Sequence, residues 1–282
     1  MSNGSAEPID GKLSLILPAH NEEPNIEAVV RQAVDVLPTL FRDYEVLVVD
    51  DGSHDRTGAI IDELAAENPH VRAIHHEKNK GYGGALTTGF RAASGDYMMF
   101  MDSDRQFDIG DLRNMVPYIP SKDIVAGYRI KRNDPYYRFL IGTGFNQMVK
   151  LLFQVNLRDI DCGFKVFKAD LLRSMDLTSP GALINTEIHA KANVQGRSIV
   201  EIGVNHYPRS AGEQSGASVK VMARAIWETF RLWGRMRSYV PPDGKIVVKP
   251  ASARGLIAVG AVGLAGLGTL LFLLTRLARR RD

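Results

Sequence analysis

Asp102-Ser103-Asp104-Arg105-Gln106 comes directly after the apolar run Tyr97-Met98-Met99-Phe100-Met101, and these two runs decide the fold class. The apolar run has the length and composition of a buried β-strand. The two carboxylates that follow at spacing i, i+2 cannot both point into a core, because an ionised carboxylate there is very costly. We therefore expect them at the C-terminal edge of the strand, where open α/β sheets bind ligands. Their oxygens suit Mg²⁺ or Mn²⁺ shared with a diphosphate, and an Asp-rich surface turn is the alternative interpretation.

The composition is that of a globular protein with a basic C-terminal quarter. The chain has 282 residues, 45% of them hydrophobic and 24% charged, so it can form one sizeable domain with an appendage. Its net charge is only +3, but arginine and lysine crowd the last quarter, which favours an anionic membrane surface over nucleic acid. The single cysteine, Cys162, excludes an internal disulfide and a metal cluster built from cysteines.

Strand-like and helical segments alternate through the first half of the chain. Strand-like runs occupy 13–17, 44–49, 71–75, 97–101 and 124–126, with helical patterns at 24–37 and 57–67 and a glycine-rich turn at 81–84 that leads into a helix through 93. This order predicts an α/β fold in which a parallel sheet is joined by right-handed crossover helices. Beyond 129 we expect helices at 136–153 and 186–194 and strands at 164–167 and 198–207.

The C-terminal region predicts an attachment to a membrane. Residues 255–275 carry no charge, and at about 1.5 Å per residue they can cross a hydrocarbon core of about 30 Å. Before this span, Trp227, Phe230 and Trp233 lie among arginines, which is typical of a helix in the membrane interface. The alternatives are a buried core helix and an ordinary surface helix, respectively. Basic residues flank the span on both sides, so the positive-inside rule hardly decides the topology; the polar start of the chain favours a cytoplasmic catalytic domain.

Three polar clusters follow three of the predicted strands. They are Leu17-Pro18-Ala19-His20-Asn21-Glu22-Glu23, Val48-Val49-Asp50-Asp51-Gly52-Ser53 and Asp102-Ser103-Asp104-Arg105-Gln106. Because the C-terminal ends of parallel strands share one edge of a sheet, we expect the three clusters to converge on one crevice. Each cluster alone is a weak signal, whereas the three together, in this order, are a strong one.

The clusters resemble the motifs of the family 2 glycosyltransferases, which have a GT-A fold. The resemblance runs from about residue 13 to residue 215 and is closest to the polyprenyl- and dolichyl-phosphate mannose or glucose synthases. Two further stretches resemble family motifs: Gly127-Tyr128-Arg129 and Asp161-Cys162-Gly163-Phe164-Lys165. Two features depart from the pattern. His20 replaces the usual tyrosine, and the stretch 209–215 lacks the lysine that often follows Gly-x-Ser.

The resemblance implies a role for each matching residue. The residues implied in nucleotide-sugar binding are Pro18, His20, Glu22, Val49, Asp51, Asp102, Ser103, Asp104, Gln106, Arg129, Arg138 and Arg209, the arginines by gathering phosphate oxygens. Asp102, Asp104 and Gln106 would hold Mg²⁺ or Mn²⁺, and the candidate catalytic residues are Asp104, Arg129 and Asp161. Asp161 and Glu187 are alternative candidates for a general base. Either residue can equally be a helix cap or an ion-pair partner.

The implied activity is inverting, metal-dependent transfer of a hexose from a nucleotide sugar of the GDP-mannose or UDP-glucose type to a polyprenyl or dolichyl phosphate. The alternatives are a glycosyltransferase with a glycan or other hydroxyl acceptor, which needs a general base, and a non-enzymatic, membrane-tethered nucleotide-sugar-binding protein. Glycines in the apolar span would allow helix packing in a homo-oligomer. The predicted organisation is a disordered N-terminus at 1–12, a GT-A domain at 13–217, an amphipathic juxtamembrane helix at 218–240, a linker at 241–254, a transmembrane helix at 255–275 and a basic tail at 276–282.

Overall fold

The computed structural model describes residues 7–130, 136–209 and 219–251, with the side chains of 136–143 and 219–224 left out of the description. The chain divides into two compact units. The first consists of Met1–Asn133, Arg158–Ile188 and Arg197–Ala217, and the second of Asp134–Leu157, His189–Gly196 and Ser218–Asp282. The GT-A domain predicted at 13–217 extends over parts of both units, since 134–157 and 189–196 belong to the second one.

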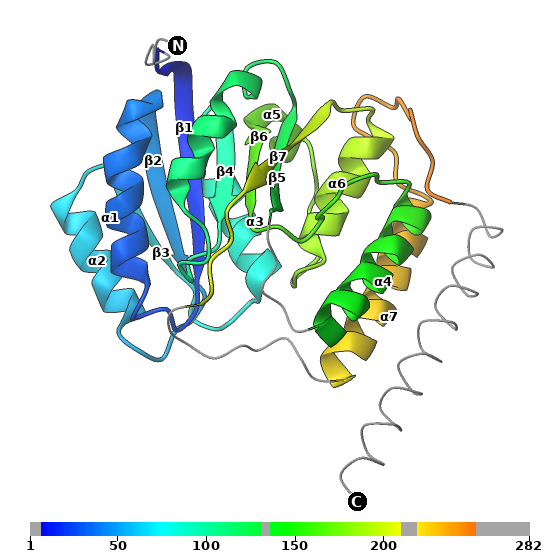
Figure 1. Ribbon diagram of the computed structural model, residues 1–282, viewed down its shortest axis with the longest axis horizontal. Coiled ribbons are helices and arrows are strands. Elements are labelled where there is room, and N and C mark those ends of the chain that lie inside the picture. The colour runs from blue at the N-terminus through cyan, green and yellow to red at the C-terminus, as the bar shows by residue number, and fades with distance from the viewer. Residues whose placement is uncertain (1–6, 131–135, 210–218, 252–282) are drawn as a thin grey trace, which may run out of the picture. The chain divides into compact units, whose positions relative to one another are not determined.

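The first unit is built on a seven-stranded sheet with the order β3-β2-β1-β4-β6-β5-β7 (Figure 1). The strands are β1 (Ile9–Ala19), β2 (Phe41–Asp50), β3 (Val71–His75), β4 (Tyr97–Met101), β5 (Ile124–Arg129), β6 (Phe164–Lys168) and β7 (Ile199–Val204). Neighbouring strands run parallel except around β6, which is antiparallel to both β4 and β5. The expected parallel α/β sheet is thus confirmed, with one reversed strand in it.

Helices alternate with the strands along the chain. They are α1 (Ile26–Val36), α2 (Thr57–Glu67), α3 (Tyr82–Ala92), α4 (Tyr136–Phe153), α5 (Ala169–Arg173), α6 (Ile184–Val194) and α7 (Val219–Met236), with short 3-10 helices at Leu37–Thr39, Ile109–Asn114 and Val116–Tyr118. Because the chain steps outward from β1 to β3 and then returns to β4, right-handed crossovers place α1 and α2 on one face of the sheet and α3 on the other. Figure 1 shows α1 and α2 in front of the strands.

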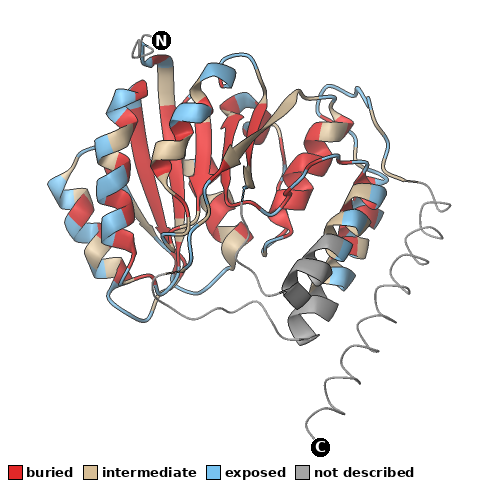
Figure 2. Cartoon of the chain, viewed as in Figure 1, coloured by how far each residue is buried: buried red, intermediate tan, exposed pale blue. Residues whose placement is uncertain are grey.

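The apolar strands are buried on both faces, as expected for a sheet between helical layers. Strand β2 contains four consecutive apolar residues, from Val46 to Val49, that have no exposed surface. Figure 2 shows the inner strands of the sheet as mostly buried and the outward sides of α1 and α2 as exposed. The sheet is therefore rigid scaffold, and polar function is confined to its edges and loops.

The first strand starts earlier than predicted. Residues 9–12, expected to belong to a disordered N-terminus, are part of β1. The Ile9 side chain is 8% exposed and joins the core, and the Ile9 N–H donates to the Leu40 carbonyl at 2.8 Å. Apolar burial at Ile9 therefore extends the strand across residues whose polar composition had indicated disorder.

The second unit contains α4 and α7, which pack against each other. The predicted linker at 241–254 has no helix or strand in its described part, yet it is bonded to this unit. The Val247 N–H donates to the Val194 carbonyl at 2.7 Å, and the Trp233 indole donates to the Ala251 carbonyl at 3.2 Å.

Among the described residues, no helix has the length and apolar character needed to span a bilayer. The span predicted at 255–275 and the basic tail at 276–282 lie outside the described residues.

Candidate active site

The three polar clusters meet at one edge of the sheet. In the strand register Ala19 pairs with Asp50, and β4 lies on the other side of β1, so β1, β2 and β4 end together. Side chains tie the ends to one another: Ser103 Oγ donates to the Pro18 carbonyl at 2.8 Å, and the Asn21 N–H donates to Ser53 Oγ at 3.0 Å. The predicted convergence of the clusters on one crevice edge is what the fold produces.

Asp102 lies between a tyrosine and a glycine from two other segments of the chain. The Tyr82 hydroxyl donates to Asp102 Oδ1 at 2.8 Å, and the other oxygen lies against Gly163, where an added Cβ would be 2.0 Å from Oδ2. Burial, and secondarily the charge of Asp104, raise the pKa of Asp102 to about 7. A nearby divalent cation would favour the ionised form of Asp102, which its surroundings oppose.

Asp104 and Gln106 complete the predicted cation ligands. Asp104 Oδ1 accepts the Gln106 N–H at 3.1 Å, and the Gln106 side-chain amide donates to the Tyr207 carbonyl at 3.1 Å. This bond uses the amide nitrogen of Gln106, which leaves its oxygen as the atom suited to a cation. The described residues contain no group of three or more His, Cys, Asp or Glu side chains arranged to hold a metal. The predicted donor set for Mg²⁺ or Mn²⁺ would consist of two carboxylates and one amide oxygen, with a diphosphate as a further ligand.

The segment after β7 crosses this edge and closes it. The Tyr207 N–H donates to the Gln106 carbonyl at 2.9 Å, and Arg209 forms an ion pair with Glu22. Burial raises the pKa of the Glu22 carboxyl, and nearby Asp104 adds to the effect, while bonds from Asn25 and Arg209 oppose it. Arg209 is thereby held beside the acidic cluster, where a phosphate would meet it.

The predicted base-binding residues divide into exposed and enclosed groups. His20 is exposed, and its Nδ1 lies 3.0 Å from the Asp51 carbonyl oxygen, which fixes the ring at the edge. The Asp51 carboxylate instead faces inward, bonded to His76 and to the Lys80 and Gly81 N–H groups. Val49, which the resemblance implied in nucleotide binding, has no exposed surface, because β2 is covered on both faces.

The arginines predicted to bind phosphate are placed differently. Arg129 is held by Asp159 through two guanidinium bonds of 2.6 and 2.8 Å, which raise its pKa against the lowering effect of burial. The guanidinium group of Arg129 is thus bonded to the carboxylate of Asp159, a residue that the sequence did not single out. The side chain of Arg138 lies outside the described side chains. Asp161, the candidate base, is exposed on the turn before β6.

Comparison with known proteins decides the family. The model of the family described as "Glycosyl transferase family 2" matches residues 14–177. The chain belongs to this family. It is a glycosyltransferase, as the motifs had predicted.

The curated relatives of this family 2 glycosyltransferase include one that is named for an undecaprenyl phosphate. It is 30% identical over 230 residues to the undecaprenyl-phosphate mannosyltransferase of Micrococcus luteus, with 78% of this chain and 92% of that protein covered. It is 32% identical over 208 residues to glycosyltransferase AglD of Haloferax volcanii, covering 70% of this chain but only 33% of that longer protein. Among solved structures, glucosyl-3-phosphoglycerate synthase from Mycobacterium tuberculosis, with Mn²⁺ and UDP, has a TM-score of 0.59 at 22% identity, covering 79% of this chain and 80% of that one. At that identity the likeness shows the shared fold.

Sequence reasoning missed three residues of this glycosyltransferase's site. Tyr82 bonds to Asp102, Asp159 to Arg129, and the fully buried Lys165 lies behind Asp102. Tyr82 lies inside the glycine-rich turn at 81–84, and Lys165 lies inside the matching stretch 161–165, so the sequence had marked both segments. Neither signal indicates which side chain a residue faces, because that depends on long-range packing.

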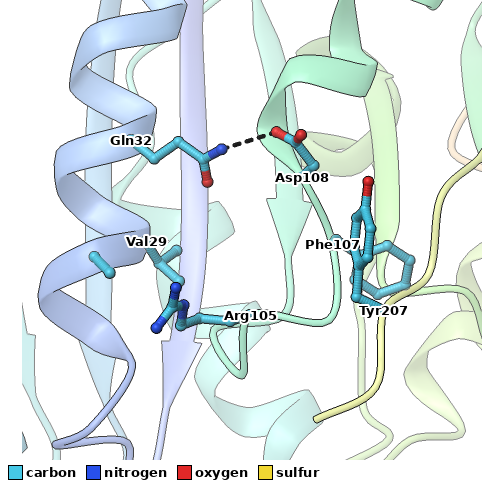
Figure 3. Close-up of a pocket in the computed structure, with 7 residues that line it drawn as sticks. Val29, Gln32, Arg105, Phe107, Asp108 and Tyr207 are labelled. Atoms are coloured by element: carbon cyan, nitrogen blue, oxygen red, sulfur yellow. Dashed lines mark hydrogen bonds between the residues drawn. The ribbon is translucent and has the colours of Figure 1, made fainter. Parts of the chain in front are cut away.

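A pocket of about 310 Å³ lies beside the edge (Figure 3). It is lined by Ala28, Val29, Gln32, Arg105, Phe107, Asp108 and Tyr207. Gln32 donates to Asp108 across it at 2.9 Å. None of the predicted site residues lines this pocket, which adjoins the site through the loop that follows Gln106.

Proposed function

We propose that this glycosyltransferase is metal-dependent and inverting, and that it transfers a hexose from a nucleotide sugar to a polyprenyl phosphate at a membrane surface. The observation that carries the proposal is the Asp102–Asp104 pair at the end of β4, with a pKa of about 7 at Asp102. The acceptor class rests on the relative from Micrococcus luteus, 92% of which aligns with this chain.

The residues at the edge divide the work of binding the donor. His20 presents an exposed ring, and Glu22 and Arg209 lie beside the acidic cluster. Asp102, Asp104 and Gln106 would hold Mg²⁺ or Mn²⁺, which supplies positive charge to the departing nucleoside diphosphate. Arg209 adds a guanidinium suited to phosphate oxygens.

The acceptor accounts for the modest supply of bases at this edge. A phosphate oxygen attacks the anomeric carbon from the face opposite the nucleoside diphosphate. The bond from that carbon to the diphosphate oxygen then breaks, so the configuration inverts. Because the acceptor phosphate is already an anion at neutral pH, its attack requires no proton removal. An acceptor hydroxyl would require it.

The second unit offers features suited to a membrane surface. The Trp227 side chain on α7 is 61% exposed, and the Arg231 guanidinium lies 5.5 Å from the centroid of its ring. Val240 and Val247 are also exposed, at 60% and 64%. Exposed aromatic and aliphatic side chains beside arginines suit the interface of an anionic bilayer. Membrane attachment would confine the enzyme to the surface that holds its lipid acceptor.

The test is a transfer assay on washed membranes that contain the full chain. Radiolabelled GDP-mannose and UDP-glucose are each supplied with undecaprenyl or dolichyl phosphate, and product is read by organic extraction. We expect label in the lipid for one donor, and at least a hundredfold loss with EDTA or in Asp104→Ala. Glu67→Gln, at an exposed acid on α2, is the control and should transfer normally.

Two outcomes would contradict the proposal. Undiminished transfer by Asp104→Ala with EDTA present would exclude metal-dependent chemistry at this edge. Transfer only to hydroxyl acceptors, abolished by Asp161→Asn with donor binding retained, would assign the enzyme to the class that uses a general base.

A further inference from the structure

A cluster of polar side chains, two of them buried, lies beside Asp102. Its members are Tyr82 at the start of α3, Lys165 on β6 and Asn185 in the first turn of α6. The Tyr82 hydroxyl donates to Asp102 and is also bonded to the Asn185 side chain. Lys165 Nζ donates to Asn185 Oδ1 at 3.2 Å. Three elements from separate parts of the chain thus converge on one carboxylate.

We propose that Tyr82, fixed by this cluster, is a positioning residue that sets the orientation of the Asp102 carboxylate for cation binding. The inference rests on the proposed function, in which Asp102 is a ligand of Mg²⁺ or Mn²⁺. One oxygen of Asp102 is fixed by the phenol and the other lies against Gly163, so the carboxylate has little rotational freedom. Partners behind a metal ligand that restrict it in this way commonly determine metal affinity.

Lys165 is the member of the cluster whose burial costs the most free energy, because it carries an ammonium group. Its side chain has no exposed surface, and burial lowers the pKa of its ammonium. The ammonium donates to the carbonyls of Ile160 and Cys162 and to Asn185, so its three donors have three acceptors. A buried ammonium stabilises a fold less well than an apolar side chain of similar size. Its place here is better explained by what it fixes, namely the turn before β6 and the amide that holds Tyr82.

A second set of bonds fixes the backbone of Tyr82. The Gly83 N–H donates to the Pro180 carbonyl at 2.8 Å, and a Cβ at Gly83 would lie 2.2 Å from the Ser179 carbonyl oxygen. The loop that contains Ser179 is itself held by Glu187, whose carboxylate accepts the Thr178 and Ser179 N–H groups. Close approach at a glycine therefore docks the start of α3 onto this loop, which brings the phenol within reach of Asp102. This assigns Glu187 a structural role in place of the predicted alternative of a general base.

The experiment measures Mn²⁺ binding by electron paramagnetic resonance on the full chain in detergent, with GDP or UDP present and no acceptor. We expect Tyr82→Phe, which removes only the hydroxyl, to weaken Mn²⁺ binding about tenfold. Tyr97→Phe, at the opposite end of β4, is the matched control and should bind as the wild type does. Asn185→Ala leaves both Tyr82 and Asp102 in place, and should weaken binding by a smaller factor.

A double-mutant cycle separates positioning from a general loss of structure. If Tyr82 acts through Asp102, Tyr82→Phe should weaken binding no further in an Asp102→Asn background. Wild-type affinity in Tyr82→Phe, or additive losses in the double variant, would overturn the inference. Failure of the proposed acceptor would appear differently, as normal Mn²⁺ binding by the wild type without transfer to lipid phosphate. A wild type that binds no Mn²⁺ with either nucleotide would overturn both the metal dependence and this inference.

Discussion

Asp102 and Glu45 are carboxylates enclosed in the same unit, yet their surroundings move their pKa values in opposite directions. Burial alone would raise the pKa of Glu45, but bonds from Ser14, Ser94 and Arg72 outweigh it and lower the pKa to about 2. Asp102 has fewer donors and a like charge beside it, so its pKa rises to about 7. Glu45 is satisfied by the fold itself, whereas Asp102 is left in a state that a ligand can improve. A strongly perturbed carboxylate of this kind is typical of functional sites.

The raised pKa of Asp102 predicts a pH dependence with a definite sign. The fold favours the neutral form, so this contribution to stability is fully present below about pH 4 and is lost as pH rises toward 7. A cation requires the ionised form. We therefore expect Mn²⁺ affinity to rise by about an order of magnitude between about pH 5.5 and 7.5. Isothermal titration calorimetry checks this, with Asp102→Asn as control. An equally steep rise in that variant would show that another group titrates.

Gly163 predicts a second effect at the residue scale. A Cβ at this position would lie 2.0 Å from Asp102 Oδ2, so Gly163→Ala must displace the carboxylate. We expect at least a tenfold loss of Mn²⁺ affinity while the far-ultraviolet circular dichroism spectrum is unchanged. Gly181→Ala is the matched control, since nothing lies within 4 Å of a Cβ there. Normal Mn²⁺ binding by Gly163→Ala would mean that the Asp102 orientation is unimportant.

At the scale of elements, periodicity predicts what a segment is but not which way it runs. The run Phe164–Lys168 is apolar enough to indicate a strand, yet nothing in five residues tells whether it pairs parallel or antiparallel. Its reversal becomes visible only in the register, where Met101 pairs with Phe164. The short α5 helix, which follows it at once, was missed because five residues are too few for a helical period. Pairing partners are set by long-range packing, which a local pattern does not contain.

Helix α7 carries a prediction at the same scale. Trp227 is 61% exposed, whereas Trp233 is 7% exposed and bonded through its indole to Ala251. The chain has only these two tryptophans, so single substitutions isolate each one. In anionic vesicles of brominated lipid, we expect fluorescence of Trp233→Phe, which retains Trp227, to be quenched strongly. The Trp227→Phe variant should be quenched several-fold less. Equal quenching in both variants would place this face of α7 away from the lipid.

For the whole molecule, the order of the strands predicts where the site lies, but it does not predict the individual side-chain contacts within the site. The three clusters converge because the topology brings parallel strand ends together, a rule that needs no coordinates. The resemblance implied that Arg129 binds phosphate, but it could not reveal that Asp159, thirty positions away, holds the guanidinium. Val49 was assigned to the nucleotide from a motif, although burial from both faces encloses its side chain.

Donor identity is accessible through the stability of the whole fold. A ligand that binds only the folded state raises the melting temperature, and the rise grows with the logarithm of the ligand concentration divided by its dissociation constant. With saturating Mn²⁺, we expect either GDP or UDP, but not both, to raise the melting temperature by several degrees. Differential scanning fluorimetry reads the shift, and Asp104→Ala should reduce it. No shift with either nucleotide in the wild type would contradict donor binding at this edge.

The reversal of β6 has a consequence for how such enzymes diversify. Strand β5 finishes at Arg129 and β6 starts at Phe164, and because β6 is antiparallel both points lie on the same rim. The chain between them therefore leaves the sheet and returns to it at the same rim. Lengthening, shortening or exchanging the chain between these two points would leave the strand order intact. Related chains could therefore recombine at these two junctions without any change to the sheet.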